Sequence, residues 1–484
     1  MISLILILAL LALLIYAILV GRNIRLSEFA SYRGRASQGQ IALSLLSSLL
    51  GGWMFFGLSA IGYEAGIVGY VVGIAYCTGL LLLAKAAPRI KRAIDNTRSD
   101  TMDEYVGHIY GRPAQIAVSA INLFFFLAVL AAQFIALAAF LSIFAQFERH
   151  EIFYVAAMVV IVYTAAAGFK GVLFTDVWQF WIIAVSVLGF SVVALSTVDL
   201  GHILETLPPK HLTGTAYGTV FLVGTILFLP ATMLVRTDLW QRIASARDIR
   251  SVQKALIITT PVLLLFYVLL TNLGIFARAY LEPGMRPDTT GLTFILVVLQ
   301  GLEGQITVTA VNGLILLFSL GILAALLSTI DTNLNVVSVA LSKLFAARSW
   351  RAFELGGESQ GQHSMAESRA LLSTRIITAV IGVLGVIVAR ILPDIVDLIV
   401  SAGAILLVFV PSAIGALRGW RVAHWGALGS VTCGYLAFLV VTALIKNPKV
   451  SFVPGVVTAA IVYGAAIVTE HARLKGAAAS TTDV

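Results

Sequence analysis

The sequence predicts an all-α integral membrane protein with about 13 transmembrane helices. Hydrophobic residues make up 59% of its 484 residues and charged residues only 12%. The mean hydropathy is +0.97, and soluble globular domains carry roughly twice this share of charge. Apolar windows of about 20 residues, the length that crosses a bilayer, recur along the whole chain with little between them. The remainder leaves no room for a separate soluble domain.

The predicted spans follow from these windows and from the polar segments between them. They cover residues 1–20, 40–63, 67–87, 115–146, 152–168, 173–197, 216–235, 255–281, 308–345, 371–391, 394–417, 423–445 and 452–469. The first window is as apolar as a signal peptide. No basic residue precedes it and no small-residue cleavage site follows it, so we interpret it as a true span.

Basic residues gather on one side of this predicted topology. Of the 32 lysines and arginines, 25 fall on the side that begins with Arg22 and Arg25, and 7 fall on the other. Because short cytoplasmic loops collect Lys and Arg, we expect the N-terminus outside and the C-terminus inside a cytoplasmic (inner) membrane. The asymmetry also explains the net charge of +8 without a nucleic-acid partner. The expected partners are the lipid bilayer and a small solute.

The ten spans after the first divide into five plus five. An odd number of spans makes the second half enter from the opposite face, so any structural likeness between the halves has to be inverted, as in many secondary transporters. The predicted units are an N-terminal extra helix with its loop, two five-helix repeats of which the second contains a flexible cytoplasmic loop at 348–369, and two C-terminal extra helices with a short tail. Their bounds are residues 1–37, 38–200, 201–420 and 421–484.

Both predicted repeats begin with a span that contains helix-weakening residues. Gly51 and Gly52 lie in the middle of the first of these spans, and each glycine weakens a helix by about 1 kcal/mol relative to alanine. Pro230 lies in the other, where it removes a helical hydrogen bond. Broken helices are tolerated inside a membrane where they line a cavity. We therefore expect a solute cavity beside the first break.

A polar cluster in the span 308–345 is the strongest functional signal. Four of the five residues from Ser328 to Thr332 carry side-chain oxygens, and one of them is Asp331. A carboxylate in hydrocarbon is costly and marks a substrate or ion path. Oxygen-only ligands suit a hard cation, and neutral ones favour a monovalent ion, so we expect Na⁺. The candidate ligands are the carbonyls of Ser47, Leu50 and Ala325 and the hydroxyls of Ser328 and Thr329.

A structural alternative exists for the same residues. Serine and threonine in membrane helices often donate to carbonyls one turn back. Gly51 and Gly52 also suit a small-residue packing face. The residues alone leave both interpretations open.

Four stretches of the chain resemble the sodium:solute symporter family, which includes bacterial sodium–proline and sodium–galactose symporters. They are residues 47–57 with Gly-Gly-Trp, Gly171 to Gln179, Trp240 to Asp248, and Ala324 to Asn333. The likeness covers roughly residues 40–420. It implies an inverted five-plus-five, LeuT-like fold with extra flanking helices, working by alternating access driven by Na⁺.

The resemblance also bears on the sites. The common sodium site of the family maps onto the five ligands already named. A matching aspartate completes another sodium site in some members, so Asp176, Ser328, Asp331 and Thr332 form a possible second cation site. Alternatively, Asp176 stabilises the start of its own helix beside Lys170. The sodium–proline branch has an aspartate where this chain has Leu49, so the substrate of that branch does not transfer.

The solute is expected near the first break. Trp53, Met54 and Phe55 are candidates for its wall, with Gln133 and Ser401 from other spans. This wall is mostly apolar and aromatic, which favours a small amino or carboxylic acid over a sugar that needs many hydrogen-bond partners. Core packing explains the same residues equally well.

The leading function is therefore Na⁺-coupled symport of a small organic solute. The alternative is a transporter-like sensor or receptor subunit that signals through a partner protein, because the chain ends about fifteen residues after its last predicted span. An enzyme is not expected, since the sequence has no metal-ligating histidine cluster, nucleophile elbow or phosphate loop.

Overall fold

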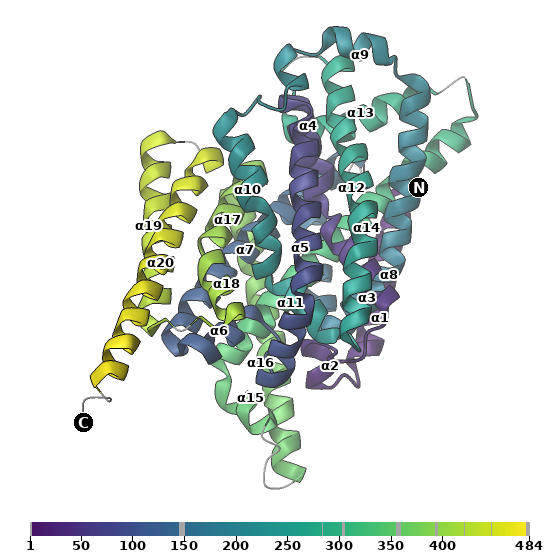
Figure 1. Ribbon diagram of the computed structural model, residues 1–484. Helices are drawn as coiled ribbons and strands as arrows, with labels where there is room; N and C mark the ends of the chain where they lie inside the picture. Colours follow the sequence, from purple (N-terminus) through teal and green to yellow (C-terminus); the bar gives the residue numbers. More distant parts are fainter. Residues whose placement is uncertain are drawn as a thin grey trace.

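Long apolar helices stand side by side through most of the molecule (Figure 1). The computed structural model describes residues 2–144, 151–282, 284–302, 305–354, 360–392, 395–420, 422–446 and 448–480. Nine of the described helices are long and apolar enough to cross a membrane, or eleven if each of two bent helix pairs forms one span. The all-helical membrane fold is confirmed, and the count of 13 spans stays a prediction.

The N-terminal half contains eight α-helices and one π-helical segment. They are α1 (Ile2–Gly21), α2 (Leu26–Ala30), α3 (Gln38–Leu49), η1 (Trp53–Leu58), α4 (Ser59–Ala65), α5 (Val68–Thr97), α6 (Met102–Tyr110), α7 (Arg112–Phe144) and α8 (Glu151–Thr197). Two predicted spans, 152–168 and 173–197, form the single element α8. Gly168 breaks it with φ +55°, a conformation that glycine adopts without strain.

The C-terminal half begins with short helices α9 (Leu200–Thr206) and η2 (Pro209–Leu212). It continues with α10 (Thr219–Val235), α11 (Thr237–Ser245), α12 (Ile249–Tyr280), α13 (Pro287–Gly301), α14 (Val308–Phe345), α15 (Ala347–Glu354), α16 (Gln360–Ile391), α17 (Ile395–Val408), α18 (Val410–Arg418), α19 (His424–Ile445) and α20 (Pro448–Ser480). The helix α13 was not predicted, because 15 residues are too few to span a bilayer.

The two bent helix pairs lie where the glycine and proline signals predict them. The α3 and η1–α4 segments meet at 50°, and α10 and α11 meet at 47°. The chain passes from α3 up to α4 but from α10 down to α11 (Figure 1). The first spans of the two predicted repeats therefore run in opposite directions, as an inverted arrangement requires.

The helix α14 forms the centre of the molecule. Every residue from Gly321 to Lys343 is buried, and α3, α7, α8 and α16 all pack against it. A polar side chain on this stretch is therefore largely shielded from water and lipid. It has to find its hydrogen-bond partners within the protein, because an unpaired buried polar group costs roughly 1–3 kcal/mol.

Two sequence expectations about loops need correction. The helix α5 continues through Pro88 to Thr97, although the predicted span stopped at residue 87. The segment predicted as a flexible loop at 348–369 contains most of α15 and the start of α16, while residues 355–359 lie outside the described chain. The indole of Trp350 on α15 donates to Ser342 Oγ at 2.9 Å, which holds α15 against α14.

A buried ion network closes the end of the molecule that carries α2, α6 and α15. Lys343 Nζ lies 2.7 Å from Asp100 Oδ2 and 2.9 Å from Glu104 Oε1, and Arg33 Nη2 lies 2.6 Å from Asp100 Oδ1. Burial alone raises the pKa of Asp100, but Lys343 and Arg33 outweigh it and hold this pKa below its usual range. The network joins α14 to the segments before α3 and before α6.

We predict that Lys343→Met lowers the apparent Tm of the purified protein by about 5 °C, because removing one partner strands buried carboxylates. Differential scanning fluorimetry in detergent measures this, with the exposed Lys254→Met as control. The lowered pKa of Asp100 contributes stability above its unfolded-state pKa, and this contribution is lost as pH falls. Because the unfolded-state pKa of Asp100 is 3.8, the deficit should be equal at pH 5 and pH 8 and smaller at pH 3. An unchanged Tm at pH 8 contradicts the prediction.

Candidate functional site

The break in the first bent pair frees backbone oxygens inside the molecule. The helix α3 ends at Leu49, and no hydrogen bond reaches the carbonyl oxygens of Ser47 and Leu50 from the described residues. On the other side of the break, the N–H of Gly52 donates to Gln133 Oε1 at 2.8 Å. The N–H of Gly52 at the break is thus paired with α7, while the carbonyl oxygens of Ser47 and Leu50 stay unpaired in the described part of the chain.

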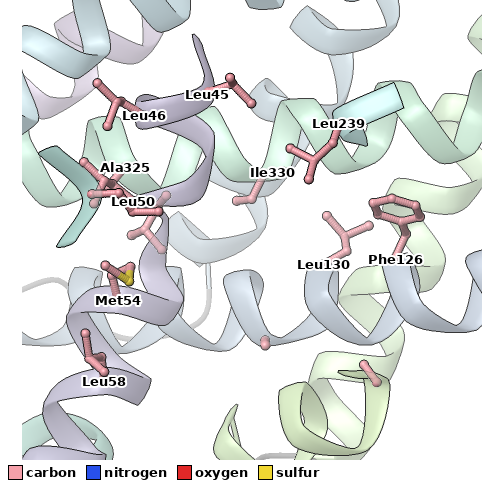
Figure 2. Packing of buried hydrophobic residues seen from close by; sticks show 14 of the residues in the cluster. Leu45, Leu46, Leu50, Met54, Leu58, Phe126, Leu130, Leu239, Ala325 and Ile330 are labelled. Atoms are coloured by element: carbon pink, nitrogen blue, oxygen red, sulfur yellow. The ribbon is translucent and has the colours of Figure 1, made fainter. Parts of the chain in front are cut away.

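Gly51 allows α14 to approach this break closely. A Cβ atom at Gly51 would collide with Oγ1 and Cβ of Thr329, so only glycine fits here. Thr329 Oγ1 lies 3.2 Å from the carbonyl oxygen of Ser48 and 3.1 Å from that of Ala325. Figure 2 shows Leu50 and Ala325 together at the same contact, within one continuous apolar cluster.

The contact brings Thr329 and Ala325 of the predicted Na⁺ ligands against the break that contains Ser47 and Leu50. Ser47 Oγ is buried and has no hydrogen-bond partner among the described residues, and two carbonyl oxygens beside it are also free. Thr329 is hydrogen-bonded one turn back, as the structural alternative expects. Ser328 is not, because its hydroxyl donates to Asp176 Oδ1 at 2.5 Å. The described chain has no cluster of three His, Cys, Asp or Glu residues able to hold a metal ion.

Two residues of the possible second cation site contact an arginine. Asp176 accepts hydrogen bonds from Ser328 and from Ser44 Oγ at 2.5 Å. Arg242 Nη2 lies 3.4 Å from Asp176 Oδ2, 3.1 Å from Thr332 Oγ1 and 2.8 Å from Ser48 Oγ. The two side chains of the Arg242–Asp176 ion pair are 1% and 0% exposed. A fixed positive charge therefore contacts Asp176 and Thr332, and a third predicted residue, Ser328, bonds to the same carboxylate.

Asp331, the fourth predicted residue of that site, engages α8 instead. Its Oδ2 accepts from Tyr163 Oη at 2.7 Å, and its Oδ1 has no partner among the described residues. No hydrogen bond or ion pair joins Asp331 to Arg242 in the described chain.

Sequence reasoning missed Arg242. It was counted with Arg236 among the basic residues of the cytoplasmic side, whereas Arg242 lies fully inside the protein. Its position four residues after Asp238 on a short helix was the available signal, because this spacing brings two side chains together. Arg242 Nη1 in fact donates to the Asp238 carbonyl oxygen at 3.3 Å. The inward turn of α11 follows from the 47° bend.

A small central cavity of about 70 Å³ lies at the meeting point of both breaks. Its walls come from α3, the segment between α3 and η1, α5, α7, the α10–α11 break, α12, α14 and α17. They are formed by Ser48, Leu49, Gly51, Trp53, Tyr76, Phe125, Val129, Gln133, Arg236, Leu263, Tyr267, Thr329, Ile399 and Gly403. Thr329 is the predicted Na⁺ ligand that lines the cavity.

The predicted solute residues divide into two groups. Trp53 and Gln133 line the central cavity. Met54 and Phe55 are fully buried in the apolar core and do not line it, because the π-helical turn points them away. The side chain of Ser401 lies outside the described residues.

A second cavity of about 80 Å³ continues from the first. The two cavities share Trp53, Tyr76, Ile399 and Gly403, and the second is otherwise lined mainly by apolar residues of α4, α5, α10, α17 and α20. Trp53 and Tyr76 thus line both cavities, of which the second is almost wholly apolar and the first also has polar groups in its wall.

Two broken helices around a central cavity are the arrangement of a secondary transporter. A Na⁺-coupled sialic acid symporter in a substrate-bound, outward-open state is structurally similar, with TM-score 0.76, 17% identity and coverage of 97% of each chain. The nucleobase-cation-symport-1 transporter Mhp1 is similar in a closed conformation (TM-score 0.54, 13% identity, 90% of this chain and 93% of that one) and in an inward-facing conformation (TM-score 0.50, 12% identity, 92% and 93%). No curated protein sequence matched.

The model of the sodium:solute symporter family matches residues 33–351. This chain belongs to the sodium:solute symporter family. It is a multi-pass membrane transporter that couples solute symport to Na⁺.

Proposed function

We propose that this protein imports a small amino or carboxylic acid together with Na⁺ by alternating access. The observation that carries the proposal is the shared wall between the oxygen cluster and the central cavity. Ser48, Gly51 and Thr329 belong to the contact of α3 with α14 and also line the cavity. A cation and a solute bound there are neighbours.

The proposed Na⁺ ligands are the five oxygens already described. Their support is the orphaned Ser47 hydroxyl, the free carbonyls of Ser47 and Leu50, and the glycine that lets Thr329 approach. All of these ligands are neutral, and such a set suits a monovalent ion. Ala325 and Ser328 complete it from α14.

Neighbouring sites explain the coupling. A cation that bridges the broken segment to α14 holds that segment in one shape, and the same segment forms the solute wall through Trp53. Each ligand then binds better when the other is present, and this mutual gain is the coupling free energy. We place the C-terminus and the basic network of Lys343 on the cytoplasmic side of the inner membrane, in line with the distribution of basic residues.

We propose that one Na⁺ is transported per solute. Arg242 already supplies a positive charge beside Asp176, within 3.4 Å. A second Na⁺ at Asp176 would meet both the repulsion of the guanidinium and the loss of its hydrogen bonds. The guanidinium of Arg242 thus supplies the positive charge that a second Na⁺ would otherwise supply at Asp176.

Uptake into proteoliposomes tests the function. We expect a radiolabelled small amino or carboxylic acid to accumulate when an inward Na⁺ gradient is imposed, and not with an inward choline gradient. Accumulation that is equal in both gradients contradicts Na⁺ coupling. Saturable solute binding without any accumulation would instead favour the sensor interpretation.

We predict that Thr329→Ala raises the Na⁺ concentration for half-maximal uptake roughly tenfold, equivalent to about 1.4 kcal/mol. The maximal rate should change less, because the variant removes an ion ligand and none of the residues proposed to bind the solute. Thr329→Ser keeps the hydroxyl and is the matched control, with a Na⁺ dependence close to that of the unmodified protein. The Na⁺ ligand assignment fails if the alanine variant keeps the original Na⁺ dependence.

We predict a Hill coefficient for Na⁺ close to 1 in the unmodified protein. Arg242→Met removes the fixed charge beside Asp176 and leaves a carboxylate that a second Na⁺ can neutralise, so its Hill coefficient should rise toward 2. Arg242→Lys retains a cation and should stay close to 1. Parallel ²²Na⁺ and solute fluxes measure the ratio directly, and a ratio of 2 in the unmodified protein overturns the one-ion proposal.

A further inference from the structure

The central cavity contains an arginine that the sequence assigned to a loop. Arg236 lies at the break between α10 and α11, where it ends one helix and precedes the next. Its side chain is 15% exposed, and that of Asp238 is 1% exposed. Because the bend directs the side chain inward, Arg236 lines the cavity beside Trp53 and Gln133.

Only one edge of this guanidinium is used by the protein. Arg236 Nε donates to Asp238 Oδ1 at 3.0 Å, and Nη2 donates to Asp238 Oδ2 at 2.7 Å. Among the described residues, no acceptor is bonded to Nη1. Asp238 fixes the plane of the guanidinium, and the remaining nitrogen is available to a ligand in the cavity.

One further donor around the same cavity lacks an acceptor. The amide oxygen of Gln133 is occupied by the N–H of Gly52, but its Nε2 is buried without a partner in the described chain. Buried donors are normally paired. The indole of Trp53 lies beside Tyr267, to which it donates. The cavity wall therefore presents two free donors from two different elements.

The described part of the cavity wall contains a guanidinium group but no carboxylate. Among the described residues that line the cavity, none is an Asp or Glu, and the nearby carboxylate of Asp238 is already bonded to Arg236. An acceptor-rich anionic group matches the free donors, whereas an ammonium group finds no carboxylate partner in this wall. The aromatic rings of Trp53, Tyr76 and Phe125 leave apolar surface for the rest of the solute.

We propose that the transported solute is a small monocarboxylate without an amino group, and that Arg236 Nη1 and Gln133 Nε2 bind its carboxylate. This inference rests on the proposed Na⁺-coupled import and narrows its solute class. The cavity volume of about 70 Å³ holds on the order of five water-sized groups at 10–15 Å³ each. Solutes of a few carbon atoms therefore fit.

Three probes of nearly equal size separate the solute classes. Propionate carries only the carboxylate, alanine adds an ammonium group, and propionamide has no charge. In proteoliposomes with an inward Na⁺ gradient, we expect labelled propionate to accumulate and unlabelled alanine or propionamide to compete at least tenfold less well. Accumulation of alanine with equal or higher efficiency overturns the carboxylate proposal.

Variants test the two donors. Gln133→Glu replaces the donor by a carboxylate and should abolish propionate uptake. Because Arg236→Gln alone would strand the buried Asp238, the double variant Arg236→Gln/Asp238→Asn removes both charges together and should also lose propionate uptake. Uptake that is unchanged in both variants overturns the assignment of the donors.

A Na⁺-binding measurement separates this inference from the proposed function. The thermal shift of the purified protein in NaCl relative to choline chloride reports Na⁺ binding without any solute. The double variant should retain this shift, which shows that it is folded. If the unmodified protein shows the Na⁺ shift but accumulates no propionate, the carboxylate proposal fails alone. If it shows neither the shift nor Na⁺-stimulated uptake of any probe, the proposed function fails as well.

Discussion

The contact between the break at Gly51 and the hydroxyl of Thr329 is the constraint on which the rest of this structure depends. The central helix α14 reaches the broken span only because a glycine offers no Cβ at that point. The contact joins Thr329 to the carbonyl oxygen of Ser48, and both residues line the central cavity. In the proposed mechanism the ion and the solute therefore share this contact, and no long-range relay is needed.

Two buried arginines give the centre its electrostatic character. Each is paired with a nearly inaccessible aspartate, Arg242 with Asp176 and Arg236 with Asp238, and such pairs are tolerated in an interior only when further hydrogen bonds satisfy them. Arg242 uses hydroxyls of α3 and α14 for this purpose. Arg236 keeps one nitrogen unused. The first arginine thus ties helices together, while the second leaves bonding capacity at the cavity.

Much of the candidate site was predictable, and the failures have a common cause. Ser47, Ser328 and Thr329 were found because a polar residue in an apolar span has few explanations. The arginines at 236 and 242 were missed because they follow an apolar span, where a basic residue normally marks a cytoplasmic loop. Only the 47° bend of the chain turns that segment back into the protein. Hydropathy records the length of a helix but not the direction of the next one.

The sequence by itself determined that this is a polytopic helical membrane protein with broken spans and an oxygen-rich centre, because these properties follow from composition, helix-breaking residues and local spacing. The tertiary structure decided which oxygens meet, since Ser48 and Thr329 are 281 positions apart. It also decided that Met54 and Phe55 pack in the core while Trp53 faces the cavity. Such outcomes depend on how a π-helical turn and two bends rotate neighbouring side chains, and a one-dimensional pattern does not contain those rotations.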